Sequence, residues 1–478
     1  MTLRDTVRNW MMNFLDLGDP ATQANRERMD SLAMLRDYYD GLQKAQLRVK
    51  SGKFDDNLTI NLCGLIVDKS VSALVGDPAD GQGLTWTFPS ETEDTTPPSV
   101  TWLDELWQAN HRDEWLHKNA LQGAMTGFPA VKIVPNGSGD IRLVNINPLI
   151  LTVETDPSDL ERIIKYIILY HVTEGNKETT HKEETFPDNP SLPAYWTIET
   201  SKKIGGEKWE LVGPPVKWEY DFAPILTWQN LPVIDSPYGR SDIEGIIPIQ
   251  DRYNFLVSNL SKIIRLYAHP QRYSRGLTAN MVDNEFKMGP DEMPGFTGEG
   301  EIIQLPPVGD LPGAMQFLQS LRESAFMLSR EVDTLSMKDK VGAITNFALR
   351  VLYRDFLDKL GTKRMLYGSA YIELNKRLLV LGGFEPEECT INWPDALPTN
   401  EVEETTALKA DMELGLCSKQ TAAEKRGYDF EDEQERIGEE GQSSDNAGGL
   451  ILSNFFKNNN QPRTQPAESV ENAIQPTA

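Results

Sequence analysis

Hydrophobic and polar residues change their spacing along the chain, and these changes divide it into helical blocks around a β-rich middle. Residues 1–50 are polar with a helical spacing. A mostly apolar segment, 54–78, closes with Gly76 and Pro78, which together form a normal end to a helix. Residues 101–127 give a second helical block. The pattern therefore predicts that the first part of the chain is helical.

Between residues 128 and 228 the spacing becomes that of β-strands. Asn136-Gly137 separates two β-prone runs, which is a strong signal for a hairpin. Residues 163–170, IIKYIILY, have the length of a core strand, and polar turns separate further β-prone runs. We expect an antiparallel β module inserted between helical blocks. The fold class is therefore predicted to be α+β, mainly α.

A long helix is predicted in the middle of the chain, over residues 241–268. Ser241 and Glu244 have the spacing of a capping box, in which each side chain satisfies the free backbone N–H group of the other residue. The helix is therefore expected to start sharply at Ser241 and to extend roughly 40 Å. Pro248 predicts either a kink or a helix start that includes the proline near the first turns.

The chain after the long helix alternates between turn-rich segments and helices. Residues 269–313 are turn-rich with short strands, and 314–335 is a second helix able to lie antiparallel to the first. A short glycine-containing break, 336–345, precedes a third helical stretch, 346–381, which a glycine pair ends. The pattern thus predicts two neighbouring helices joined by a turn-rich insert.

The C-terminal part is predicted to be helical and then flexible. Residues 401–414 form an acidic helix stopped by Gly415, and Ser418 caps a further helix. Asp429 has the position of a cap for a last helix. Residues 441–478 are rich in Gly, Asn, Gln, Pro and Ser, a composition that is typical of a flexible tail.

Composition limits the classes of protein that this chain can represent. At 478 residues it is too long for one ordinary domain. Acidic residues number 72 against 47 basic ones, for a formal net charge of −25, so the chain repels nucleic acid at long range. This argues against a repressor or a packaging histone. A protein with a surface along which DNA passes without binding tightly remains possible.

Cysteine usage and hydropathy indicate a protein made in a reducing cytoplasm. Cys63, Cys389 and Cys417 lie far apart, which favours neither a disulfide framework nor a zinc site. The N-terminus lacks the apolar core of a signal peptide, and no run of about 18 apolar residues predicts a membrane span. We expect a soluble protein without a membrane partner.

No catalytic, cofactor-binding or metal-binding residue can be assigned from motifs. The sequence has no Gly-x-x-x-x-Gly-Lys-Ser/Thr, no His-Glu-x-x-His and no Gly-x-Ser-x-Gly. The many carboxylates lie on polar helix faces or in turns, whereas a two-metal nuclease needs them gathered around a core. We expect no enzyme and no cofactor, and a metal-dependent nuclease is the weaker alternative.

Basic residues are concentrated in one helical stretch. Residues 346–381 hold seven basic and three acidic residues, whereas 401–440 hold five basic and thirteen acidic ones. This contrast suggests that most of the basic side chains pair with acidic helices of another subunit. Lys338 and Lys340 differ, because a loop between two helices can project them into open space.

Four stretches in this order resemble the portal proteins of tailed bacteriophages, especially the long-tailed type. They are YYDG followed by NLTINLCGLIVDKSVSALVGDP, then PYGRSDIEGIIPIQDRYNFLVSNL, then the segment around VGAITNFALRVL, and last LPTNEVEETTALKADMELGLCSKQTAAEKRGYDFEDEQERIGEE. The resemblance covers about residues 54–440. It implies a ring, usually a dodecamer, around a DNA channel at one capsid vertex of the virion.

The resemblance also implies a division of the chain into the parts of a portal. These are a wing (1–235), a stem helix (236–268), a clip (269–313), a second stem helix (314–335), a tunnel loop (336–345), a long wing helix with a β return (346–400), crown helices (401–440) and a flexible tail (441–478).

The resemblance further implies roles and partners. Lys338 and Lys340 would make weak, sequence-blind contacts with passing double-stranded DNA. The clip would dock the terminase large subunit during packaging and later the head-completion adaptor, and major capsid and scaffolding proteins would be further partners. The candidate docking residues are Arg272, Arg275, Asp291 and Glu292. The alternative is a capsid scaffold or adaptor that does not form a ring.

Overall fold

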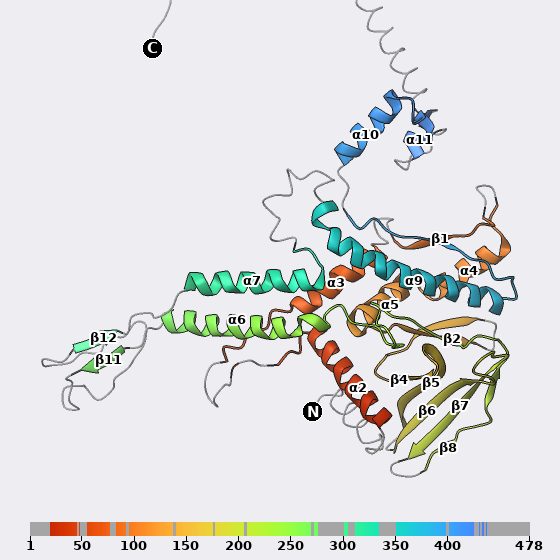
Figure 1. Cartoon of the computed structure of the whole chain (residues 1–478), viewed down its shortest axis with the longest axis horizontal. Coiled ribbons are helices and arrows are strands. Elements are labelled where there is room, and N and C mark those ends of the chain that lie inside the picture. The colour runs from red at the N-terminus through yellow and green to blue at the C-terminus, as the bar shows by residue number, and fades with distance from the viewer. Residues whose placement is uncertain are drawn as a thin grey trace, which may run out of the picture. The chain divides into compact units, whose positions relative to one another are not determined.

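The structure is a computed structural model, drawn in Figure 1. It describes residues 20–44, 47, 55–76, 83–91, 95–136, 140–174, 177–204, 208–268, 272–275, 301–304, 311–333, 350–397, 401–424, 430, 433–434 and 436. The chain divides into two compact units, Met1–Pro398 and Thr399–Ala478.

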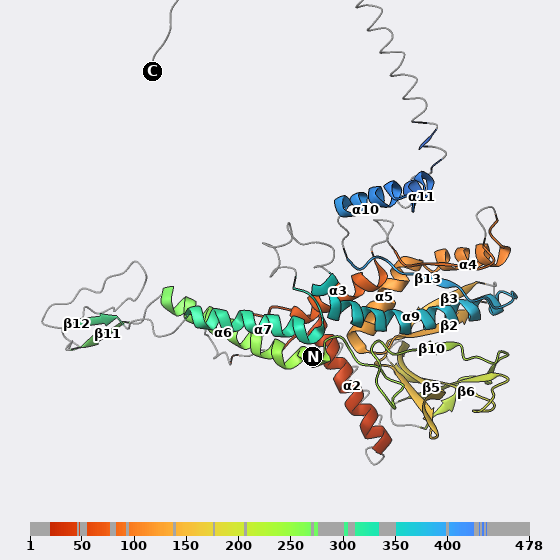
Figure 2. The same cartoon turned by 45° about the horizontal axis from the view of Figure 1, so that its top comes forward.

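Helices of the first unit come from both its beginning and its end. They are α2 (Pro20–Tyr39), α3 (Leu62–Val75), α4 (Pro98–Ala109), α5 (Arg112–Thr126), the 3₁₀ turn η2 (Glu244–Ile246), α6 (Ile247–Ala268), α7 (Leu311–Ser329) and α9 (Arg354–Leu381). Helix α9 runs beside α3, α4 and α5 and also contacts the β module (Figures 1 and 2).

Strands form four antiparallel sheets in the described part of the first unit. They are β1 (Thr85–Thr87), β2 (Ala130–Pro135), β3 (Ile141–Asn145), β4 (Leu151–Asp156), β5 (Asp159–Glu174), β6 (Lys177–Pro187), β7 (Trp196–Ile204), β8 (Glu210–Leu211), β9 (Val216–Trp218), β10 (Ile225–Thr227), β11 (Arg272–Arg275), β12 (Glu301–Gln304) and β13 (Thr390–Asn392). The orders are β1-β13, β10-β2-β3, β11-β12 and β4-β5-β6-β7-β8, with β9 also paired to β7. The predicted α+β class and its antiparallel module are confirmed.

The core of the first unit is built around α9. Its buried apolar positions include Tyr367, Leu374 and Leu378, which recur at helical spacing. Some polar groups inside this core are paired: the Trp107 indole donates a hydrogen bond to Asn375 at 2.9 Å. Since buried polar groups without partners are costly, such pairs allow aromatic side chains with polar atoms to fill the interior.

Two predicted helices have different limits in the structure. The segment 54–78 is helical only from Leu62, because the backbone of the preceding residues bonds to side chains of α6 instead of to itself. The block 101–127 is broken into α4 and α5 at His111, whose φ is 53°, and the Asn110 side chain ties the break to Leu106 and Ile141. The helix stop at Gly76 is confirmed by its φ of 79°.

The predicted capping box at Ser241 and Glu244 is not formed. The Ser241 hydroxyl accepts a hydrogen bond from the Ile243 N–H group at 3.2 Å and donates one to Ala124 at 3.0 Å, while Glu244 is exposed. The α-helix begins six residues later, at Ile247, after a 3₁₀ turn. Pro248 therefore lies in the first turn of α6, which was one of the two expected positions.

The two following helices are shorter than predicted. Helix α7 ends at Ser329 instead of residue 335, because Arg330 takes a left-handed backbone conformation with φ of 55°. The predicted stretch 346–381 is helical at residues 350–352, is interrupted at Tyr353, and continues as α9 from Arg354 to the predicted glycine pair, where Gly383 has φ of 78°.

In the second unit, the described helices are α10 (Glu401–Glu413) and α11 (Lys419–Glu424). The predicted stop at Gly415 is confirmed by its φ of 73°, and the predicted cap is confirmed because the Ser418 hydroxyl accepts a hydrogen bond from Thr421 N–H at 3.1 Å. Asp429 lies outside the described residues.

Candidate functional site

The candidate site is the antiparallel pair of helices α6 and α7 together with the place where the pair joins the rest of the unit. The two helices lie side by side in both views, as the sequence predicted (Figures 1 and 2). Tyr253 of α6 and Ala325 of α7 are buried in one apolar cluster with Leu62. Strands β11 and β12 pair with each other and lie between α6 and α7 in the sequence. The chain thus leaves along one helix and returns along the other.

An extended segment, residues 56–61, and the first residue of α3, Leu62, lie along α6 through regularly spaced hydrogen bonds. The N–H groups of Leu58, Ile60 and Leu62 donate to the side chains of Ser258, Asn254 and Gln250, at 3.0, 3.0 and 2.9 Å. Two extended residues advance about 6.6 Å and four helical residues about 6.0 Å, so the two periods match.

The extended segment is also held by charge. The Asp56 carboxylate accepts two hydrogen bonds from Arg265, at 2.7 and 2.6 Å, and these bonds lower the pKa of the carboxyl. A bidentate arginine–carboxylate pair fixes orientation as well as distance. The segment and α6 are therefore joined over most of the length of the helix.

Replacing Asn254 with alanine is expected to lower the free energy of unfolding by about 1–3 kcal/mol, because it leaves the Ile60 N–H group without its acceptor. Hydrogen exchange of the Ile60 amide should also become faster. Asn259→Ala, on the same helix but outside this row of hydrogen bonds, is the matched control and should have little effect. Equal effects of the two variants would show that the row does not hold the segment.

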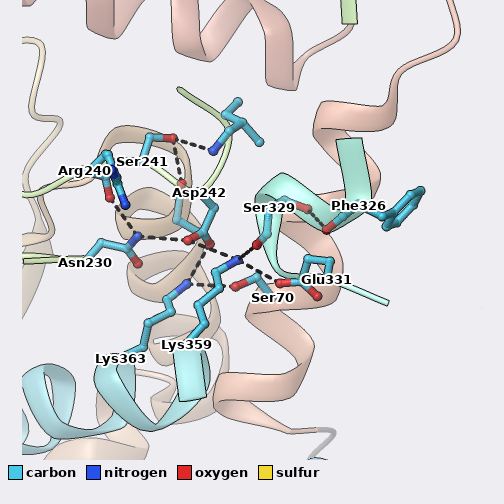
Figure 3. A network of polar contacts seen from close by, with 12 residues as sticks. Ser70, Asn230, Arg240, Ser241, Asp242, Phe326, Ser329, Glu331, Lys359 and Lys363 are labelled. Carbon is cyan, nitrogen blue, oxygen red and sulfur yellow. Dashed lines mark hydrogen bonds and ion pairs between the residues drawn. The ribbon is translucent and has the colours of Figure 1, made fainter. Parts of the chain in front are cut away.

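The pair joins the rest of the unit through four buried charged side chains, which we call the ion cluster: Asp242, Glu331, Lys359 and Lys363 (Figure 3). Lys363 Nζ lies 2.7 Å from Asp242 Oδ2, and Lys359 Nζ lies 2.9 Å from Glu331 Oε1 and 3.5 Å from Asp242 Oδ1. Ser70 of α3 accepts a further hydrogen bond from Lys363 at 2.9 Å. The cluster connects four parts of the chain.

The ion cluster is electrically balanced, with two positive and two negative groups. Each side chain is at most 2% exposed, so each charge needs partners inside the protein. Burial tends to raise the pKa of the Asp242 carboxyl, but Lys363 and Lys359 together lower it. Burial raises the pKa of Glu331, which has Lys359 as its main counter-charge. Asp242 is therefore the firmly ionised centre and Glu331 the weaker member.

These two shifts have opposite consequences for stability. Asp242 has a lowered pKa, so its contribution is present above the ordinary aspartate range and is lost only as the pH falls below that range. Glu331 has a raised pKa, so ionising it opposes folding, and its contribution falls as the pH rises through that raised value.

Asp242 belongs to a turn that closes the C-terminal end of α5. The Asp242 N–H group donates to Ala124 at 2.9 Å, and the Asn230 N–H group donates to Gly127 at 2.9 Å. These bonds satisfy carbonyl groups that have no partner within the helix. Gly127 and Gly239 approach so closely that a Cβ atom on either would lie 2.5 Å from the carbonyl oxygen of the other.

Most basic residues of α9 find partners within the chain, so the predicted intersubunit pairing is wrong for them. Lys359 and Lys363 form the ion cluster. The other contacts to neighbouring elements are Arg364 with the carbonyl groups of Ala73 and Pro394, Lys376 with Glu388, and Arg377 with the carbonyl groups of Ala223 and Ile225. They fasten α9 to its neighbours in the fold.

The structure gives partial information on the other residues assigned from the sequence. Arg272 and Arg275 lie on β11, where they stand opposite Gln304 and Glu301 of β12. The remaining candidates lie outside the described residues; they are Asp291, Glu292, Lys338 and Lys340.

A comparison with protein families adds to this geometry. The family model described as "Phage portal protein, SPP1 Gp6-like" matches residues 19–447, which is most of the chain. The chain belongs to the phage portal protein family. The predicted resemblance is thereby confirmed. No curated protein matches the chain.

Membership of the portal family defines the broad role of the chain. A phage portal protein is a structural component, a head-tail connector that takes part in DNA packaging. Among the described residues, no group of three or more His, Cys, Asp or Glu side chains could hold a metal ion. In the same residues, no helix is long and apolar enough to cross a membrane.

Proposed function

We propose that the chain assembles with copies of itself into a ring at one capsid vertex, and that α6 and α7 form the wall of its central channel. Double-stranded DNA would enter through this channel, driven by the terminase motor, and would leave through it on ejection. Head-completion and tail proteins would attach to the same ring. The portal family supports this role in general terms, and the helix pair supports the assignment of the wall.

The observation that carries the proposal is the apolar surface left on the helix pair. Ile264 on α6 is 59% exposed, and Met315 and Phe317 on α7 are 66% and 49% exposed. All three lie in the parts of the helices that are farthest along the chain from the ion cluster. Exposed apolar side chains on a helix surface favour burial against another protein surface. Met315 and Phe317 are two positions apart and therefore point to different sides of α7, so we assign neighbouring copies on both sides of the helix pair.

The other parts of the portal would come from the remaining elements of the chain. Helices α2 to α5, the β module and α9 would form the wing, β11 and β12 the base of the clip, and α10 and α11 the crown. The clip residues of the sequence prediction would face the motor and the adaptor, while major capsid and scaffolding proteins would contact the outside of the ring.

Charge supports passage of DNA rather than retention. Each copy has a formal charge of −25, so a ring repels phosphate groups and gives DNA no large gain from releasing counterions. Lys338 and Lys340 would provide weak contacts with the DNA backbone in the tunnel loop, within about 8 Å of the duplex at physiological salt.

Electron micrographs of the purified chain in negative stain test the proposal. We expect rings with a central hole and, by light scattering, one fixed subunit number. Phe317→Asp should prevent ring formation by placing a charge in the contact between copies, whereas Leu192→Asp, at a position 79% exposed in the β module, should not. Monomers alone, or assemblies of variable mass such as a scaffold forms, would contradict the ring.

A further inference from the structure

The chain leaves α7 through a turn that its own sequence does not favour. In this exit turn, residues 329–333, the N–H groups of Arg330 and Glu331 bond back to Met327 and Phe326 at 3.1 and 2.9 Å. This is the bonding of a helix end in which the left-handed position is usually a glycine. Here that position is Arg330, with φ of 55°. A side chain in this conformation is strained.

The side chain of Arg330 does not explain its conformation, because it is exposed. The residues on either side of it are held instead. Lys359 Nζ donates to the Ser329 carbonyl group at 3.0 Å and to Glu331 Oε1 at 2.9 Å, so one ammonium group spans the strained residue. Farther along, Asp333 accepts two hydrogen bonds from Arg322 of α7, at 2.7 and 3.0 Å.

Lys359 has a second carboxylate within reach. Asp242 Oδ1 lies 3.5 Å from its ammonium group, and Lys363 holds the other oxygen of Asp242 at 2.7 Å. If Glu331 moves away, Lys359 still faces the buried Asp242 carboxylate, although the cluster then holds one excess positive charge. The ion cluster therefore permits an arrangement with Glu331 bound and another with Glu331 released.

We propose that the exit turn is a conformational switch, in which the Lys359–Glu331 contact holds Arg330 in its strained conformation and loss of this contact lets the chain after α7 take another direction. The root of α6 stays fixed in both states, since Asp242 is bound to Lys363 and its N–H group to Ala124. The switch thus acts on the end of α7 alone. It does not depend on the chain forming a ring.

Hydrogen–deuterium exchange of the full-length protein tests the switch in the amides of residues 330–333. Glu331→Gln is expected to raise the exchange rate of these amides about tenfold, because the charged contact with Lys359 is lost from the arrangement in which residue 331 is bound. Arg330→Gly is expected to lower the exchange about fivefold, because glycine adopts positive φ without strain. Combined, the two substitutions should bring the exchange back toward that of the parent protein.

Arg330→Ala is the matched control, because it removes the same side chain but keeps a Cβ atom and hence the strain. It should exchange like the parent. Equal exchange of the glycine and alanine variants would overturn the proposal, and so would parental exchange in Glu331→Gln. If Glu331→Gln speeds exchange throughout α3 as well, the substitution has unfolded the unit. The comparison of Arg330→Gly with Arg330→Ala then decides whether the proposal holds.

Discussion

Asp242→Asn is expected to lower the free energy of unfolding by about 3–5 kcal/mol, which is typical of breaking a buried ion pair by removing the charge of one partner. The substitution keeps the shape of the side chain but leaves Lys359 and Lys363 with only Glu331 to balance them. Both lysines are at most 2% exposed, so water cannot solvate the excess charge. Urea unfolding at a fixed protein concentration measures the loss.

Asp358→Ala provides the control for this substitution. Asp358 also pairs with a basic residue, Arg354, but at 4.0 Å and with both side chains more than 70% exposed. Removing such a surface pair is expected to change stability by no more than about 0.5 kcal/mol. If Asp242→Asn were as mild as Asp358→Ala, the ion cluster would not be what joins the helix pair to α9.

Gly127→Ala is expected to cost about 3 kcal/mol or more, because two effects add. Gly127 has φ of 83°, and an added Cβ atom would lie 2.5 Å from the Gly239 carbonyl oxygen and 2.8 Å from the Arg240 carbonyl carbon. Backbone atoms cannot rotate away as a side chain can. The turn that presents Asp242 to the two lysines would therefore have to move. The midpoint temperature of thermal unfolding should fall, and fewer rings should form.

Gly383→Ala separates the two effects. Gly383 also has a positive φ, 78°, but a Cβ atom there would meet nothing within 4 Å. Only the cost of the left-handed conformation remains, about 1 kcal/mol. A similar loss in both variants would mean that the close approach of Gly127 to Gly239 adds little to the junction.

Helix ends marked by glycine could be predicted from the sequence. Gly76, Gly383 and Gly415 all have positive φ in the structure, because glycine reaches this conformation without a steric penalty. The β2–β3 hairpin was predicted for a similar reason, from turn residues between two β-prone runs. These are local signals, and they do not depend on which distant residues come together.

The junction could not be predicted, because it depends on contacts between distant segments. Asp242 and Lys363 are separated by 121 positions in the sequence. The sequence does contain one signal for the junction, which is the position of Lys359 and Lys363 on α9. They share the buried face of this helix with apolar residues, namely Phe356, Leu360 and Tyr367. Lysines among apolar residues at helical spacing indicate buried ion pairs, whereas the total charge of the stretch suggested a surface.

The capping box failed for a related reason. Ser241 has the right spacing to Glu244, but its hydroxyl is already bound to the end of α5, and the chain makes a 3₁₀ turn before α6 begins. Likewise, the sequence predicts a helix over the extended residues 56–61 because their apolar character fits both structures. The polar side chains of α6 decide between the two by accepting the backbone N–H groups.

An electron cryomicroscopy reconstruction of the assembled protein would show where the helix pair lies in the ring. We expect a closed ring in which α6 and α7 of each copy stand nearest the axis and contact the neighbouring copies through Ile264, Met315 and Phe317. Finding the helix pair on the outer rim, or finding these three side chains exposed to solvent in the assembled state, would contradict this expectation.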